Sequence, residues 1–122
     1  MTQSFLRAAG LALAILATVP AEAHHSFAMF DKTKLVSIKG SVSKVEWTNP
    51  HAYLFVVNPA APTKIYAFEC SSPNELNRWG WKANTIKVGD TVTVQFFPLK
   101  DGSPGGLVYS VSLPNGKVVK AN

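Results

Sequence analysis

Polar and apolar residues alternate along much of the chain after residue 34, with the period of two that is typical of β-strands. In the first such segment, residues 35–47, the apolar positions change parity. They are Val36, Ile38 and Val42, followed by Val45 and Trp47. A slip of one residue within a strand predicts a β-bulge and a strong bend. Gly40 is compatible with such a bend.

Four further strands are predicted downstream, each rich in β-branched and aromatic residues and bounded by turn-forming residues. They cover residues 52–58, 64–70, 91–97 and 107–113. A short tail strand near residues 118–119 follows the hairpin signal Pro114-Asn115-Gly116.

One short helix is predicted between the third and fourth strands. Ser72 is a suitable N-cap, Pro73 suits the first helical position, and Glu75 completes a capping box. Gly80 ends the helix after about two turns. The order β-β-β-α-β-β predicts a mainly β fold, a small OB-like barrel of five to six strands. A generic six-stranded barrel is the alternative.

The first 23 residues have the layout of a cleavable signal peptide. Arg7 precedes an apolar run over residues 8–19, and Ala21 and Ala23 provide small residues before the predicted cut. The run is too short to span a bilayer, which argues against the alternative of an uncleaved membrane anchor. We therefore expect residues 24–34 to form an N-terminal arm and residues 35–122 to form the barrel domain.

Export to the periplasm or the medium follows from this leader, and no membrane span remains after its removal. The whole chain has 122 residues and a formal net charge of +5. Cleavage removes one basic and one acidic residue, Arg7 and Glu22, so the charge is unchanged. The single cysteine, Cys70, excludes an internal disulfide and a zinc site made of cysteines alone.

Cleavage after Ala23 would make His24 the first residue of the exported chain. Its free amine and its imidazole then form a natural chelate for one metal ion, and His25 and His51 offer two further imidazoles. Nitrogen ligands of this kind favour copper over nickel and zinc. Cys70, Asp31 or Met29 would complete the ligand set. The alternative is that the histidines are ordinary polar residues, with His51 hydrogen-bonded to the backbone of the turn that contains Asn49 and Pro50.

Aromatic and basic residues suggest a second kind of site. Trp47, Trp79 and Trp81, together with Tyr53, would form a stacking platform on a small barrel, or else pack in its core. Lysines give the domain a basic surface suited to an anionic envelope component or a partner protein. Nucleic acid is not expected as a partner, because an exported protein seldom meets it.

No enzyme signature is present, and we expect the protein not to be an enzyme. The chain lacks a His-Glu-x-x-His motif, a nucleophile elbow, a phosphate loop and a dinucleotide-binding glycine pattern. Cys70 could be a nucleophile with His51 as its base, but almost any short chain contains one cysteine and one histidine, so this pairing is weak evidence for catalysis.

Several motifs resemble those of a family of small exported bacterial proteins catalogued as a domain of unknown function (number 6152). The motifs are His24-His25-Ser26-Phe27-Ala28-Met29-Phe30-Asp31, then the run from Gly40 to Ala52 that contains Trp47-Thr48-Asn49-Pro50-His51, then Ser72-Pro73 through Trp79-Gly80-Trp81, and Val88-Gly89-Asp90. The resemblance implies a periplasmic β-barrel domain and carries no established activity. Cys70 lies outside these motifs, whereas the predicted metal ligands and Asn49 lie within them.

The leading hypothesis is therefore an exported copper-binding module that uses His24, His25 and His51. The alternative is a non-catalytic accessory protein that binds a partner through a surface containing Trp47, Asn49, Trp79 and Trp81.

Overall fold

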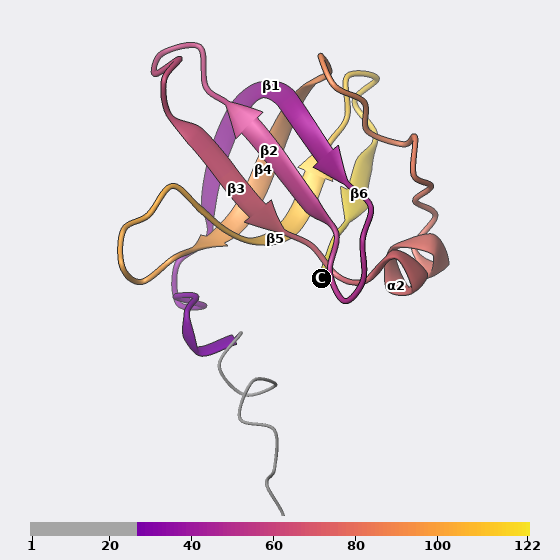
Figure 1. Ribbon diagram of the computed structural model, residues 1–122, viewed down its shortest axis with the longest axis horizontal. Coiled ribbons are helices and arrows are strands. Elements are labelled where there is room, and N and C mark those ends of the chain that lie inside the picture. Colours follow the sequence, from indigo (N-terminus) through magenta and orange to yellow (C-terminus); the bar gives the residue numbers. More distant parts are fainter. Residues whose placement is uncertain (1–26) are drawn as a thin grey trace, which may run out of the picture.

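A computed structural model describes residues 27–122. Six strands and one short helix follow one another along this part of the chain (Figure 1). They are β1 (Val36–Glu46), β2 (Tyr53–Val57), β3 (Ile65–Glu69), α2 (Pro73–Arg78), β4 (Thr91–Pro98), β5 (Gly105–Ser112) and β6 (Val118–Lys120).

The strands form one sheet in the order β3-β2-β1-β4-β5-β6, and a parallel pairing between β3 and β5 closes it. The result is a closed barrel of five strands with β6 added at the edge of β5. All the other pairings are antiparallel. This architecture, with its helix between the third and fourth strands, confirms the predicted OB-like barrel.

The first strand is long because it serves two neighbours. Its first half, Val36–Ser41, pairs with β4, and its second half, from Ser41 onward, pairs with β2. The register shifts between Val42 and Lys44, where the change of parity predicts a bulge. A Cβ on Gly40 would lie 2.5 Å from the carbonyl oxygen of Val57, so the close approach of β1 and β2 at this bend requires glycine.

One edge of β5 pairs with two strands, β3 and β6. Gly105 to Leu107 pair with β3, and Ser110 to Ser112 pair with β6. Gly105 has a φ of 137°, and a Cβ there would collide with the backbone of Ala67. The barrel therefore closes at a point where two backbones meet without side chains between them.

The helix α2 lies at one end of the barrel, at the right of Figure 1. Ser72 caps it by accepting a hydrogen bond from the backbone N–H of Glu75, as predicted. The Glu75 carboxylate pairs with Arg78 instead of returning to the cap. Leu76 from α2 and Trp81 and Ile86 from the segment after it are buried in the main hydrophobic core.

The core fills the inside of the barrel, and a second contact holds the N-terminal segment. Phe30 is buried, with 4% of its surface exposed, and its backbone forms a bridge with Leu99 at the end of β4. The N–H of Asp31 donates to the carbonyl of Pro98, and the N–H of Lys100 donates to the carbonyl of Met29. The described part of the predicted arm is therefore fixed beside the connection between β4 and β5.

Candidate functional site

His51 lies in the loop between β1 and β2, next to the end of β3. Thr48 closes this loop, because its hydroxyl donates a hydrogen bond of 2.9 Å to the carbonyl oxygen of His51. The backbone of the next residue, Ala52, exchanges two hydrogen bonds with the chain after β3: its N–H donates to Ser71, and its carbonyl accepts from Cys70. The loop therefore holds His51 against the end of β3.

The His51 ring is oriented by a backbone carbonyl. Nδ1 lies 3.2 Å from the carbonyl oxygen of Cys70. Since a carbonyl only accepts hydrogen bonds, Nδ1 carries the hydrogen and Nε2 presents its lone pair when the ring is neutral. Metal-binding histidines commonly show this arrangement, in which one ring nitrogen donates to a carbonyl and the other binds the ion.

The free nitrogen of His51 faces a carboxylate. Nε2 lies 3.4 Å from Oε1 of Glu69, the last residue of β3. The two side chains are 32% and 12% exposed, so the pair sits at a partly open surface. Burial raises the pKa of the Glu69 carboxyl above its ordinary value, while the nearby His51 acts in the opposite direction.

Two other polar side chains border this pair on the outside of the barrel. Tyr53 stands between Glu46 and Glu69 in the register of β1, β2 and β3. Burial raises the pKa of the Tyr53 hydroxyl, and the negative charges of Glu69 and Glu46 add to the effect. Glu46 itself forms an ion pair of 2.7 Å with Lys44.

Of the three predicted metal ligands, the structure describes His51. His24 and His25 lie outside the described residues, so their position relative to His51 is not part of the structure. Within residues 27–122, no three His, Cys, Asp or Glu side chains gather closely enough to hold a metal ion. What the structure adds to His51 is one carboxylate, that of Glu69.

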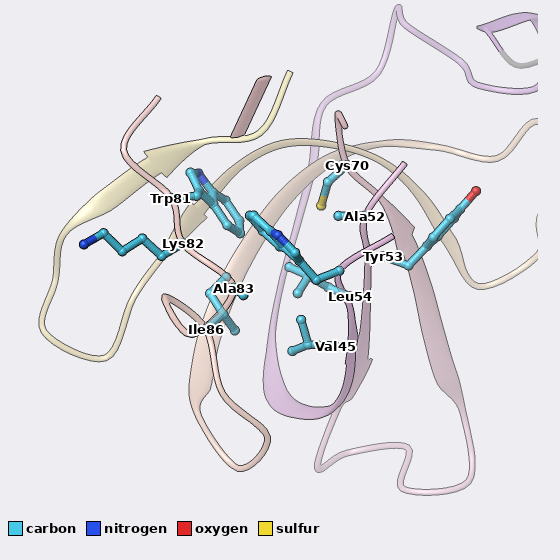
Figure 2. Close-up of a pocket in the computed structure, with 10 residues that line it drawn as sticks. Val45, Ala52, Tyr53, Leu54, Cys70, Trp81, Lys82, Ala83 and Ile86 are labelled. Atoms are coloured by element: carbon cyan, nitrogen blue, oxygen red, sulfur yellow. The ribbon is translucent and has the colours of Figure 1, made fainter. Parts of the chain in front are cut away.

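The side chain of Cys70 is not available to this site. Only 1% of the residue is exposed, it belongs to the main core, and burial raises the pKa of its thiol far above the ordinary range. In Figure 2 its sulfur points toward Ala52 and the interior of the barrel. Cys70, Asp31 and Met29 were the three candidates for completing the ligand set. For Cys70 that prediction is wrong. Asp31 and Met29 lie on the segment beside β4, and Asp31 is already hydrogen-bonded to Thr33.

The tryptophans are mainly structural. Trp81 is 3% exposed and its indole N–H donates to the carbonyl of Lys120, so its place on a binding surface was a wrong prediction. Trp47 and Trp79 are partly buried and pack against the core, and Lys120 lies over the ring of Trp79. Asn49 is exposed in the loop before His51.

The space enclosed near these residues is too small for a ligand. Figure 2 shows Trp81 and Ile86 from the segment after α2 and Leu54 from β2 converging on it. Its volume is about 10 Å³, the room needed by a single water molecule. This space therefore does not admit a planar ring.

Glu69 is the residue that sequence reasoning missed. Spacing along the chain indicates no partner for its carboxylate. The signal lies in the strand alternation: Phe68 points inward, so Glu69 points outward at the end of β3, beside the loop that begins β2. Combining that alternation with the β2–β3 register would have placed Glu69 near His51.

Within the described chain, residues 27–122, no helix has the length and apolar character to cross a membrane. No curated protein matches the sequence. A family model described as "Family of unknown function (DUF6152)" matches residues 12–109, which include β1 to β4 and most of β5. The match confirms the resemblance that the sequence motifs indicate. The chain belongs to the DUF6152 family.

Proposed function

We propose that this protein is an exported, non-enzymatic module that binds a transition-metal ion, with copper as the preferred metal. The observation that supports the proposal is the pairing of His51 and Glu69. Nε2 of His51, which presents a lone pair when the ring is neutral, and a carboxylate oxygen of Glu69 face each other at a partly open surface, 3.4 Å apart. Both are ordinary ligands of transition metals.

The spacing of the two atoms suits a shared ion. Two ligands that are each about 2 Å from a tetrahedral ion lie about 3.3 Å apart. The observed separation therefore needs almost no adjustment for a tetrahedral metal such as zinc. A copper(II) ion with square ligand geometry would bring the two atoms to about 2.9 Å, a small movement for side chains at a surface.

Two ligands do not complete a metal site, and the proposal assigns the remaining ligands to the start of the exported chain. If the leader is removed after Ala23, His24 contributes its amine and its imidazole, and His25 contributes a further imidazole. In Figure 1 the described chain starts at the lower left, on the side of the connection between β4 and β5, and the β1–β2 loop that carries His51 lies at the lower right, nearer α2. Four nitrogen ligands and one carboxylate favour copper among the divalent metals.

Export is the first part of the proposal to be tested. The full gene, with its own leader, is expressed in a Gram-negative host, and the protein recovered from the periplasm is analysed by intact mass spectrometry. We expect the mass of residues 24–122. Recovery only from the cytoplasm or the membrane fraction, or a mature chain that begins elsewhere, would contradict the predicted start at His24.

The second test titrates the exported protein with copper(II) and with zinc(II) by calorimetry. We expect one equivalent of copper to bind, and His51→Gln and Glu69→Gln to weaken binding at least tenfold. Thr48→Val is the matched control, because it changes the same loop through the bond to the His51 carbonyl but removes no ligand. Equal affinity in the wild type and both ligand variants would overturn the site.

A second candidate function is supported by the basic surface. Lys39, Lys82 and Lys87 are exposed and form no ion pair within the described residues. Such a surface suits an anionic envelope component or an acidic partner protein. Sedimentation with vesicles of phosphatidylglycerol, compared with vesicles of phosphatidylcholine, tests this alternative. Equal recovery with both would exclude a role for anionic lipid.

A further inference from the structure

The two ends of the barrel differ. At one end, α2 and the chain that follows it bury Leu76, Trp81 and Ile86 in the core. At the other end lie the starts of β1 and β3 and the loop between β4 and β5, which is at the left of Figure 1. This second end contains an open groove of about 340 Å³. We call it the barrel mouth.

Aromatic and aliphatic side chains line the barrel mouth from the inside. Ile38 and Phe96 belong to the main core and also line the groove, and Tyr66 is half-buried there. Tyr66 stacks on Phe68, with ring centroids 5.9 Å apart, and Phe68 in turn contacts Phe96 at 4.7 Å. A ligand entering the mouth would therefore meet the partly exposed ring of Tyr66, which the buried rings of Phe68 and Phe96 hold in place.

Polar groups line the rim of the barrel mouth, and the charged group among them is positive. Ser37, Asn58 and Ser103 provide hydroxyl and amide groups, and Lys64 is the charged residue of the lining. Its ammonium lies 5.3 Å from the centre of the Tyr66 ring and makes no ion pair within the described residues. The lining contains no carboxylate. Lys64 thus offers an anion a positive partner, and the Asp101 carboxylate beside the rim accepts a hydrogen bond from the N–H of Ser103.

We propose that the barrel mouth is a binding site for a small aromatic carboxylate. The ring of the ligand packs against Tyr66, and its carboxylate pairs with the ammonium of Lys64. Barrel mouths are common places for ligand sites, and the groove has the size of the smaller ones. The site does not include His51 or Glu69, so it can be tested independently of metal binding.

Three features argue for this chemical class. The rings favour a planar apolar body over a sugar or a flexible chain, because aromatic side chains gain most from stacked or edge contacts with another ring. The lone lysine favours a negative group at one end of that body. The volume limits the ligand to one or two rings, since larger molecules would extend beyond the groove.

The test uses benzoate as the probe and the exported protein labelled with ¹⁵N. Amide shifts are followed during titration with benzoate, with benzamide as the neutral isostere and with acetate as an anion that lacks a ring. We expect saturable benzoate shifts at Ser37, Tyr66 and Ser103, with a Kd of about 1 mM, the affinity typical of so small a ligand. Benzamide is expected to bind more weakly at the same residues, and acetate is expected not to saturate.

Three variants make the result specific. Lys64→Gln is expected to weaken benzoate binding about fivefold and to leave benzamide binding unchanged, whereas Lys87→Gln, outside the mouth, changes neither. Ser103→Trp fills the groove from an exposed loop position and is expected to abolish both. The proposal is overturned if benzoate shifts do not saturate, if they map to other residues, or if Lys64→Gln and Lys87→Gln weaken binding equally.

Discussion

The indole Nε1 of Trp81 lies 2.8 Å from the carbonyl oxygen of Lys120 and donates a hydrogen bond to it. This bond connects the chain after α2 to β6, two segments that are 39 residues apart in sequence. The ring of Trp81 is at the same time part of the main core. Trp81 therefore fixes the helical end of the barrel to its last strand.

Trp81→Phe is expected to lower the free energy of unfolding by about 2 kcal/mol, because it leaves the Lys120 carbonyl without this donor and opens a cavity. Urea unfolding measures the change. Trp79→Phe is the matched control: Trp79 is only partly buried, and phenylalanine keeps a ring beneath Lys120, so a loss below about 1 kcal/mol is expected. Equal losses in the two variants would show that the bond to Lys120 contributes nothing.

Gly40→Ala is expected to destabilise the protein by about 2–3 kcal/mol, as other insertions into tightly packed positions do. The new Cβ would lie 2.5 Å from the Val57 carbonyl oxygen and 2.7 Å from Cγ1 of Val56. The neighbouring Ser41→Ala, at an exposed position, should change stability by less than about 0.5 kcal/mol. Thermal and urea unfolding measure both variants. A Gly40→Ala protein as stable as the wild type would show that β1 and β2 separate easily at the bend.

Asp31 is expected to make a stabilising contribution that depends on pH. The hydroxyl and the backbone N–H of Thr33 donate to its carboxylate and lower its pKa. A carboxyl whose pKa is lower in the folded state stabilises the fold above its unfolded pKa, about 4. That contribution is lost as the pH falls through the folded value. We therefore expect Asp31→Asn to have a lower Tm than the wild type near neutral pH and the same Tm near pH 2. A Tm difference that persists at pH 2 would refute this explanation.

Cys70 is expected to resist alkylation while the protein is folded. Its side chain is buried, and the same burial raises the pKa of the thiol, so little thiolate forms and reagents do not reach it. Iodoacetamide near pH 8, followed by mass spectrometry, checks this directly, because the chain has one cysteine. We expect no label in buffer and complete labelling in concentrated urea. Rapid labelling of the folded protein would contradict the placement of Cys70 in the core.

Much of the fold was accessible from local sequence patterns. The alternation of apolar residues gave the strands to within about two residues, and the parity change in the first strand correctly indicated the bulge near Val42. Ser72 and Gly80 marked the limits of the helix. The closure of the barrel through β3 and β5 was inferred only from the order of elements, because parallel pairing between distant strands leaves no local signal.

The candidate site was less accessible, because it depends on contacts between segments. The loop position of His51 was apparent from Asn49 and Pro50, but its orientation by the Cys70 carbonyl depends on the packing of that loop against β3. For Trp81 the sequence left a binding surface and core packing as alternatives, and only the packing of the chain after α2 against β6 decides for the core. Glu69 required the register of two strands, which turns and loop lengths do not specify fully.

In the proposed site, His51 provides a nitrogen ligand to a bound copper ion. Electron paramagnetic resonance of the exported protein with one equivalent of copper(II) measures this directly, since each bound nitrogen splits the signal. We predict coupling to three nitrogens or more in the wild type, the loss of one nitrogen coupling in His51→Gln, and no change in Thr48→Val. A spectrum that is identical in the wild type and His51→Gln, or that shows only hydrated copper, would contradict the claim.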